Sequence, residues 1–364
     1  MYIAIRFPVK DYFISLPTQK INKVLDLFKY TKELSKHLSK ADNILLVCHI
    51  NPDGDAIGSQ LALYHYLISK GKNPVMISPN YLQDFLKWMD GVDKINIFIR
   101  DRKVCKDLIY KSDLIIMVDF NQSNRLGEAE DLVMNSKAKK VIIDHHLNAN
   151  RFADLEICDP SKCSTSELLH ELITIINNGI FRNEAYSEAV YVGIITDTGN
   201  FEHGAFTGST FRVIADLLET GIDKNRIFNL VFNNFSADRL RLQGFSLNER
   251  MVVLPEYKTA YIFLTRDDLS KYNYKKGDTE GFVNLPLSIS DVDFSVLFIE
   301  KDGFIKLSFR SKGNFSVSEF AKNYFAGGGH INAAGGEYYD SLGNTLKYFL
   351  EVLKKDAWKI LNES

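Results

Sequence analysis

Short apolar runs alternate with amphipathic segments through the first part of the chain. Four runs have the length of buried strands, at residues 43–48, 74–78, 114–118 and 140–143. Residues 55–71 have the apolar spacing of a helix and end on Gly71, a residue that often follows the last helical turn. Strands that alternate with helices are typical of a mostly parallel, doubly wound α/β sheet, which is the fold class that we predict.

The pattern changes twice further along the chain. Residues 164–250 are mainly helical in spacing, and Ser164 with Glu167 three residues on fits a helix capping box. Residues 251–265 and 293–311 then alternate apolar and polar positions, which predicts two β-hairpins. An amphipathic helix is expected at 346–361, so the second part of the chain predicts a smaller α/β domain.

The chain has 364 residues, more than one hydrophobic core usually serves, and this length favours two domains. The changes in pattern give the expected boundaries. We predict an N-terminal extension that packs on the first domain (1–40), the first domain (41–235), a helical linker (236–250) and the second domain (251–364).

Composition narrows the class of protein. A formal net charge of −2 does not indicate a globally basic nucleic-acid binder, although a local basic patch stays open. We find neither an apolar run of about 18 residues nor a clear signal-peptide pattern, so no membrane partner is expected. The four cysteines lack a common zinc-binding spacing. We therefore predict reduced thiols and a cytoplasmic location.

Acidic and histidine residues follow the predicted strands. The first strand leads into His49, Asp53 and Asp55, the third into Asp119, the fourth into Asp144, His145 and His146, and a further apolar stretch ends on Asp197. Taken singly, each residue would more often close a strand or cap a helix. Because ligands bind at the carboxyl ends of strands in open α/β sheets, four such groups at comparable strand ends predict one shared site.

The residue types of these groups suit metal ions. Carboxylates gathered in one place repel each other, and a cation is the usual way to stabilise such a cluster. Mixed imidazole and carboxylate ligands favour Mn²⁺, with Fe, Co or Mg as alternatives, over Ca²⁺. The number of candidate ligands suits two ions about 3.5–4 Å apart with a bridging carboxylate.

The second domain contains a glycine-rich segment at residues 325–336. Three consecutive glycines are costly in backbone entropy, which favours either backbone N–H groups that approach a phosphate or a plain flexible loop. His330 would add a donor there. Arg310 could bind a phosphate through its forked guanidinium or could be an exposed hairpin arginine.

The remaining histidines have less acidic company. His37, His65 and His170 lie in helical patterns and are expected to be surface or packing residues. For His203 a place at the rim of the site stays open.

Together these motifs resemble the DHH phosphoesterase superfamily. "HINPDGDAIGS", "VDF", "DHH", "GIITDTGNF" and "GGGHINAAGG" occur in the order of that family, over roughly residues 41–340. The glycine-rich motif resembles the DHH-associated C-terminal domain, which family-II pyrophosphatases replace by a different domain. The length argues against the longer RecJ-type exonucleases. The compact oligoribonuclease/pAp-phosphatase (nano-RNase) type is the most similar.

The resemblance assigns roles to matching positions. One metal would be held by His49, Asp53 and Asp119, and the other by Asp55, Asp119, His145 and Asp197, with Asp119 bridging. His146 would face the scissile phosphate, and Asp144 would support the site from behind. The substrate-binding residues would be Arg310, Ser311, Gly328, Gly329 and His330. The role of Arg125 stays open between substrate contact and loop support. Ile331 departs from the family, which often has proline there.

The resemblance also implies an activity. We expect an enzyme that binds two divalent ions, Mn²⁺ first with Mg²⁺ or Co²⁺ as alternatives, in a cleft between the two domains. It would hydrolyse short single-stranded RNA or DNA to 5′-mononucleotides, or remove the 3′-phosphate of pAp, by two-metal hydroxide attack. An alternative is a phosphodiesterase for cyclic dinucleotides (c-di-AMP) or pApA. A non-catalytic nucleotide-binding module is less favoured, and a homodimer stays open.

Overall fold

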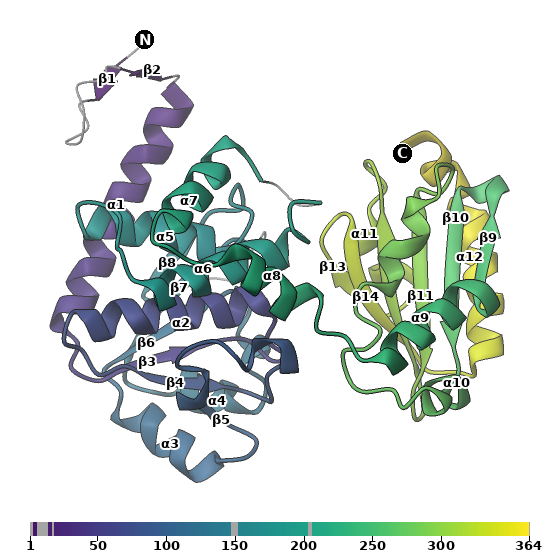
Figure 1. The fold of residues 1–364 in the computed structure, drawn as a ribbon, viewed down its shortest axis with the longest axis horizontal. Helices are drawn as coiled ribbons and strands as arrows, with labels where there is room; N and C mark the ends of the chain where they lie inside the picture. The colour runs from purple at the N-terminus through teal and green to yellow at the C-terminus, as the bar shows by residue number, and fades with distance from the viewer. Residues whose placement is uncertain (1–2, 6–13, 17, 147–151, 203–205, 364) are drawn as a thin grey trace. The chain divides into compact units, whose positions relative to one another are not determined.

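The computed structural model describes residues 3–5, 14–16, 18–146, 152–202 and 206–363. The chain divides into two compact units, Met1–Asn234 and Phe235–Ser364, and each has its own six-stranded sheet (Figure 1). A short antiparallel pair, β1 (Ile3–Ile5) and β2 (Ile14–Leu16), precedes the first unit's core. The α/β fold class is as predicted, and the roles predicted for the individual domains stay predictions.

The sheet of the first unit is entirely parallel. Its strands are β3 (Ile44–Val47), β4 (Val75–Ser78), β5 (Ile95–Ile97), β6 (Leu114–Val118), β7 (Lys139–Asp144) and β8 (Leu155–Cys158). They lie in the order β5-β4-β3-β6-β7-β8. The winding direction therefore reverses between β3 and β6, and in such sheets ligands bind where this reversal opens a crevice.

Helices cover both faces of this sheet. One face carries α1 (Thr18–Lys40), α2 (Gly54–Ser69), α5 (Thr165–Ile176), α6 (Glu184–Asp197), α7 (Gly208–Leu218) and α8 (Lys224–Phe232). The other carries α3 (Arg102–Lys111) and α4 (Glu130–Met134) (Figure 1). Successive residues of β6 enter opposite cores, Ile116 on the first face and Met117 on the second. Burial on both faces explains why these strands are continuous apolar runs.

The second unit has a mixed sheet. Its strands are β9 (Met251–Leu254), β10 (Thr259–Leu264), β11 (Phe294–Glu300), β12 (Ile305–Ser311), β13 (Gly328–Gly329) and β14 (Ala333–Tyr338). The order is β13-β14-β12-β11-β10-β9. Only the β10–β11 pair is parallel, and both predicted hairpins are confirmed as the antiparallel pairs β9–β10 and β11–β12.

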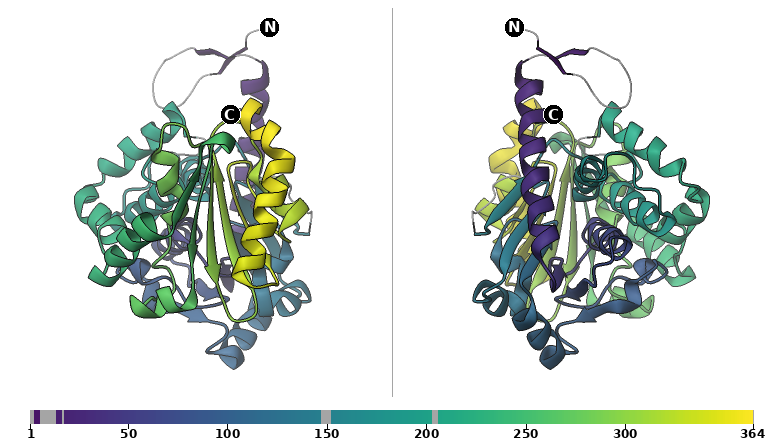
Figure 2. Two further views of the ribbon diagram at one scale, coloured as in Figure 1. Left: turned by 90° about the vertical axis from the view of Figure 1, so that its right-hand side faces the viewer. Right: turned by 90° about the vertical axis from the view of Figure 1, so that its left-hand side faces the viewer.

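Helices also cover both faces of the second sheet. Its helices are α9 (Ala237–Glu249), α10 (Arg266–Lys271), α11 (Val317–Tyr324) and α12 (Leu342–Glu363). Helix α12 runs roughly along the strands on one face of the sheet (Figure 2), and its Phe349 packs with Phe294 and Phe320 in an aromatic core. Leu242 of α9 and Leu269 of α10 belong to the core on the other face.

One element differs from the sequence prediction. Asp197 was expected at a strand end, but it is the last residue of helix α6. This helix is buried between its neighbours, and a helix that is apolar all round resembles a buried strand over a short window. Strands β5 and β8 and helix α3 were not predicted. The two strands lie at the sheet's edges, where apolar runs are short.

The cysteines form no disulfide bonds with one another. Cys48, Cys105, Cys158 and Cys163 are all free thiols, as expected. Among the described residues, no helix combines the length and the apolar character that crossing a membrane requires.

Candidate metal centre

The segment after β3 turns sharply and then starts α2. Asp53 caps this helix, since its Oδ1 accepts hydrogen bonds from the N–H groups of Asp55 (3.1 Å) and Ala56 (3.0 Å). Its other oxygen, Oδ2, lies 3.7 Å from Nε2 of the buried His49. Asp53 therefore uses one oxygen for the helix cap, and its other oxygen faces His49, while its role as a metal ligand stays a prediction.

Asp119 directly follows β6 and has a left-handed backbone with φ of +68°. This conformation is unfavourable for residues other than glycine and often marks functional sites. The side chain is only 3% exposed. Its Oδ2 lies 3.3 Å from His49 Nε2, and its Oδ1 lies 3.7 Å from His145 Nε2. The two oxygens of one carboxylate thus face two different histidines.

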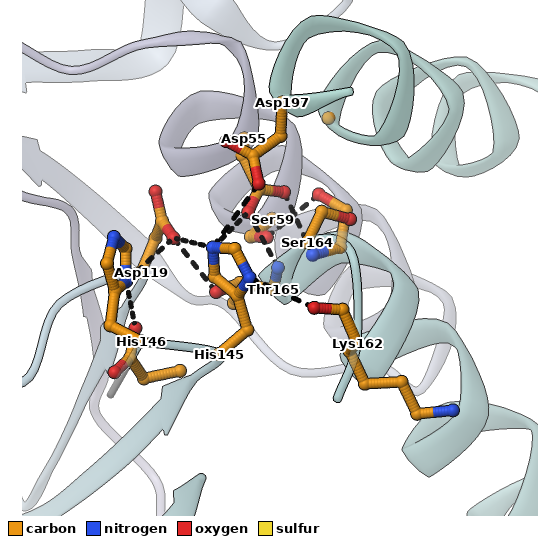
Figure 3. A network of polar contacts seen from close by, with 12 residues as sticks. Asp55, Ser59, Asp119, His145, His146, Lys162, Ser164, Thr165 and Asp197 are labelled. Atoms are coloured by element: carbon orange, nitrogen blue, oxygen red, sulfur yellow. Dashed lines mark hydrogen bonds and ion pairs between the residues drawn. The ribbon is translucent and has the colours of Figure 1, made fainter. Parts of the chain in front are cut away.

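The three residues Asp144, His145 and His146 complete this corner at the end of β7 (Figure 3). His145 Nε2 lies 3.3 Å from Asp197 Oδ2 and 4.0 Å from Asp55 Oδ2. His146 Nδ1 lies 2.7 Å from Oδ1 of the fully buried Asp144. Although Asp197 comes from a helix end, it reaches the same place as the strand-end residues.

A backbone carbonyl oxygen lies beside Nδ1 of each of two histidines. His49 Nδ1 lies 2.7 Å from the carbonyl oxygen of Ile50, and His145 Nδ1 lies 3.2 Å from that of Lys162. A carbonyl oxygen only accepts, so in these contacts Nδ1 carries the hydrogen and Nε2 keeps its lone pair. This is the arrangement typical of metal-binding histidines.

Arg125 supports the same segment. Its carbonyl oxygen accepts a hydrogen bond from Ile50 N–H (2.8 Å). Its Nη2 lies 3.0 Å from His49 Nδ1 and can donate to that nitrogen only in the opposite tautomer, so this contact and the Ile50 contact are alternatives. Of the two roles left open for Arg125, the structure shows loop support, through the hydrogen bond from Ile50 N–H to the Arg125 carbonyl oxygen.

All six predicted metal ligands come together. His49, Asp53 and Asp119 form one group with ligand atoms within 4.8 Å of one another, and Asp55, His145 and Asp197 form another. Asp119, His145 and His146 form a third group that connects the first two. This grouping agrees with the two predicted ligand sets, while the role of each residue as a ligand stays a prediction.

Electrostatics also favour cations at this place. Burial, together with the charges of Asp55 and Asp53, raises the pKa of Asp119 well above its usual range. Burial and the Asp55 charge raise the pKa of Asp197 to about 8. Burial lowers the pKa of His49, which keeps this imidazole neutral and able to bind a metal. A divalent cation would offset the repulsion and let the carboxylates ionise, so the donor set fits such ions.

Burial and charge act in opposite directions on His146. Burial alone would lower the pKa of this imidazole. The hydrogen bond to Asp144 and the charges of Asp144, Asp55 and Asp53 outweigh burial and raise it. His146 therefore holds a proton more readily than an ordinary histidine does.

The sequence did not reveal the donors behind the carboxylates. Thr165 and Ser166 open helix α5, and their backbone N–H groups donate to the two oxygens of Asp55 (2.6 and 2.9 Å) (Figure 3). The Thr165 hydroxyl donates to Asp119 Oδ1 (2.9 Å). The sequence signal was the predicted capping box of Ser164 and Glu167, which marks the start of this helix beside the site.

The glycine-rich segment borders an open hollow of about 540 Å³ in the second unit. The lining includes Glu280, Lys306, Ser308, Arg310, Gly328 and Gly329. Burial lowers the pKa of Arg310, while the Glu280 charge opposes this effect. A partly desolvated arginine guanidinium at such a hollow can bind a phosphate.

The glycines are required by the close approach of two backbones. A Cβ atom at Gly327 would lie 2.0 Å from the Gly335 carbonyl oxygen. Gly329 has φ of +153°, and a Cβ atom there would lie 2.4 Å from the Ala333 carbonyl oxygen. Strand β13 thus pairs tightly with β14, so the segment is a paired hairpin and not a plain loop.

Two other predicted substrate residues lie beside this hairpin. His330 follows β13, and its N–H donates to the Ala333 carbonyl oxygen (2.7 Å). The buried Ser311 hydroxyl donates to the Phe315 carbonyl oxygen (2.7 Å) and accepts from Asn332 Nδ2 (3.0 Å). Ser308, which the sequence analysis did not name, lines the hollow beside Arg310. The substrate contacts of His330 and Ser311 stay predictions.

His170 and His65 have hydrogen-bond contacts of their own outside the candidate metal centre. His170 is buried, and its Nδ1 lies 3.2 Å from the Tyr186 hydroxyl, in agreement with a packing role. His65 Nε2 lies 3.0 Å from the Asp90 carbonyl oxygen. His203 lies outside the described residues, so its place at the rim is not tested.

Comparison with known proteins gives two family matches. Residues 43–194 match a model described as the DHH family, N-terminal domain, and residues 256–359 match one described as the DHHA1 domain. The chain is 29% identical over 308 residues to the bifunctional oligoribonuclease and PAP phosphatase NrnA of Bacillus subtilis (strain 168), covering 84% of this chain and 93% of that protein.

Solved structures agree with these matches. An exopolyphosphatase-related protein from Bacteroides fragilis is 40% identical with a TM-score of 0.89, over 92% of this chain and 98% of that one. The exonuclease RecJ bound to manganese is 15% identical with a TM-score of 0.55, over 93% of this chain and 96% of that one. The second likeness concerns the fold alone.

Proposed function

Because the chain belongs to the DHH family and is a metal-dependent phosphoesterase, we propose that it hydrolyses short oligonucleotides to 5′-mononucleotides and removes the 3′-phosphate of pAp. The likeness to the Bacillus subtilis protein, whose name carries both activities, supports this choice of substrates. The hydrolysed bond would be a phosphoester in both cases, so one site would serve both substrates.

A single observation carries the proposal. Asp119 follows β6, beside the point where the winding of the sheet reverses, and its two oxygens face His49 and His145. Its carboxylate therefore lies between two groups of candidate ligands: His49 with Asp53, and Asp55 with His145 and Asp197. One carboxylate between two groups of imidazole and carboxylate donors is the arrangement that a two-metal phosphoesterase needs. We propose Mn²⁺ as the preferred ion, with Mg²⁺ or Co²⁺ as alternatives.

The chain's own residues would have distinct roles in hydrolysis. Divalent ions, when bound, would supply Lewis acidity toward the phosphoryl oxygens and the attacking water. The carboxylates would hold those ions, and His146 would stay on the substrate side. Its pKa is raised by the hydrogen bond and charge of Asp144 in spite of burial, which favours the protonated ring. His146 would give this proton to the leaving oxygen and neutralise its charge.

The second unit has its own candidate site for a phosphate group. Arg310, Gly328 and Gly329 border a hollow that can take a phosphate or a nucleotide.

The test uses a matched pair of aspartates on one strand. Asp119 directly follows β6, while Asp113 directly precedes it and accepts backbone N–H groups of Asp42 and Asn43. We expect D119N to lower turnover of pApA and pAp with Mn²⁺ by at least about 10³-fold, since losing a bridging charge costs several kcal/mol of transition-state stabilisation. D113N should keep nearly normal turnover.

The same assay would include c-di-AMP and pyrophosphate as further substrates. Near wild-type activity of folded D119N would contradict the two-metal assignment. Activity on c-di-AMP with none on pApA or pAp would contradict the proposed substrates and leave the metal assignment in place.

A further inference from the structure

The first turn of helix α5 contacts the metal centre through more than one kind of donor. The N–H groups of Thr165 and Ser166 bind both oxygens of the Asp55 carboxylate. The start of a helix carries partial positive charge, which stabilises an adjacent anion. The Asp55 carboxylate, 1% exposed, is thus held in a fixed orientation from behind.

Thr165 makes a second contact through its side chain. Its hydroxyl donates to Asp119 Oδ1 at 2.9 Å, so this one residue binds a carboxylate of each proposed metal group. Thr165 has no exposed surface, and water therefore does not replace either contact. A carboxylate oxygen has two lone pairs, so the oxygen that accepts from Thr165 can still bind an ion.

Several side chains fix the first turn of α5 in turn. The Ser164 hydroxyl accepts from Glu167 N–H (3.0 Å), and Glu167 accepts from Cys163 N–H (2.9 Å) and from the Thr210 hydroxyl (3.1 Å). The Ser166 hydroxyl lies 2.9 Å from that of Ser59 on α2, the helix that also carries Asp55. These contacts prevent Thr165 from moving independently of the carboxylates.

Helix α6 packs closely against both the first turn of α5 and Asp55 of α2. A Cβ atom at Gly193 would lie 2.0 Å from Ser166 Oγ and 2.7 Å from Asp55 Oδ1. Only glycine leaves room here for the α5 turn and Asp55 to meet. The three helices are therefore packed to bring backbone and hydroxyl donors against the carboxylates.

We propose that Thr165 is a positioning residue that fixes Asp119 and Asp55 relative to each other and so sets the affinity of the centre for divalent ions. The inference rests on the proposed two-metal site. Donors behind the ligands of metal sites commonly change metal affinity by about 10- to 100-fold when removed.

The experiment measures Mn²⁺ binding by calorimetry on metal-stripped, full-length protein. Thr165→Val keeps the shape and the backbone N–H to Asp55 and removes only the hydroxyl, so we expect Mn²⁺ affinity to fall about 10- to 100-fold. Thr165→Ser restores the hydroxyl and should remain within about threefold of wild type. A rescue by serine separates the hydroxyl contact from packing alone.

The control is another threonine of the same helix. Thr174 Oγ1 is buried and has no hydrogen-bond partner among the described residues, so Thr174→Val should keep wild-type affinity. Circular dichroism checks folding. If Thr165→Val does not unfold cooperatively, Thr165→Ala is titrated in its place with the same expectation.

The outcomes distinguish the two proposals. Two Mn²⁺ ions on wild type with unchanged affinity in the Thr165→Val or Thr165→Ala protein would overturn the role of Thr165 alone. Fewer than two ions on the wild-type chain would overturn the proposed function, and the role of Thr165 with it.

Discussion

Buried carboxylates that share one site make the metal-free protein sensitive to pH. Asp197 illustrates the effect, since burial and the Asp55 charge raise its pKa from the usual 3.8 to about 8. The folded chain therefore keeps a proton that the unfolded chain loses at a much lower pH. Stability from such a group is complete below the unfolded pKa and is lost as the pH rises through the folded pKa.

We expect the melting temperature of the metal-free protein to fall between about pH 4 and pH 8. Asp197→Asn removes the titrating group, so its melting temperature should fall less over the same range. Saturating Mn²⁺ should suppress the fall in the wild-type protein, because a cation favours the ionised carboxylates. Melting curves with Mn²⁺ or with EDTA measure this. Equal pH profiles for wild type and D197N without metal would contradict the expectation.

The residues of the site were predictable to different degrees. The acids and histidines are recognisable in the sequence, because few roles other than metal binding explain why they occur together after the strands. Thr165 does not, because a threonine at the start of a helix is common and its partner Asp119 is 46 positions away. The donors that hold a site are ordinary residues, and only the fold shows which of them meet the ligands.

At the scale of elements, helices α2 and α6 pack unusually closely beside the centre. A Cβ atom at Gly58 of α2 would lie 2.5 Å from the Ala189 carbonyl oxygen of α6. Asp55 lies one turn before Gly58 on α2, and Asp197 ends α6. The distance between these two carboxylates therefore depends on how closely the helices approach.

Gly58→Ala is expected to lower the free energy of unfolding by about 1–3 kcal/mol, the usual range for overpacking a close contact. Chemical denaturation measures this change. The control is Gly244→Ala in α9, where a Cβ atom would meet nothing within 4 Å. There alanine should stabilise by about 0.5–1 kcal/mol, because glycine is unfavourable inside a helix. Equal effects of the two changes would contradict the packing argument.

The sequence predicted the central elements better than the peripheral ones. Strands such as β6 are buried on both faces, so their apolar runs are continuous and visible. Strand β5 has three residues at the sheet edge and includes the polar Asn96, which leaves little signal. Helix α6 was partly misjudged for the opposite reason, since full burial removes the polar face that identifies a helix.

At the scale of the whole molecule, the two units carry different chemistry. The first gathers carboxylates and imidazoles, and the second has Arg310 beside a glycine hairpin. Each unit has its own sheet and its own cores, so a change in one should leave the binding properties of the other intact.

Arg310→Ala is expected to raise KM for pAp by about 10- to 100-fold, which corresponds to one charge-assisted hydrogen bond. Its affinity for Mn²⁺ should stay at the wild-type value. Arg241→Ala is the control, since this exposed arginine pairs with Asp238 on the surface of α9. Steady-state kinetics and Mn²⁺ titration of the three proteins measure both quantities. A wild-type KM in R310A would contradict the proposed role of Arg310 in substrate binding.

The candidate ligands are far apart along the chain, so the ribosome synthesises them at different times. His49, Asp53 and Asp119 are all made before Asp197, the last ligand of the other group. At the usual ribosomal rate of about 5–20 residues per second, Asp197 follows Asp119 by roughly 4 to 16 s. Thr165, which contacts both groups, is made within that interval. The proposed ligands are therefore made in two stages, and a metal ion captured before Asp197 is made would meet an incomplete set of them.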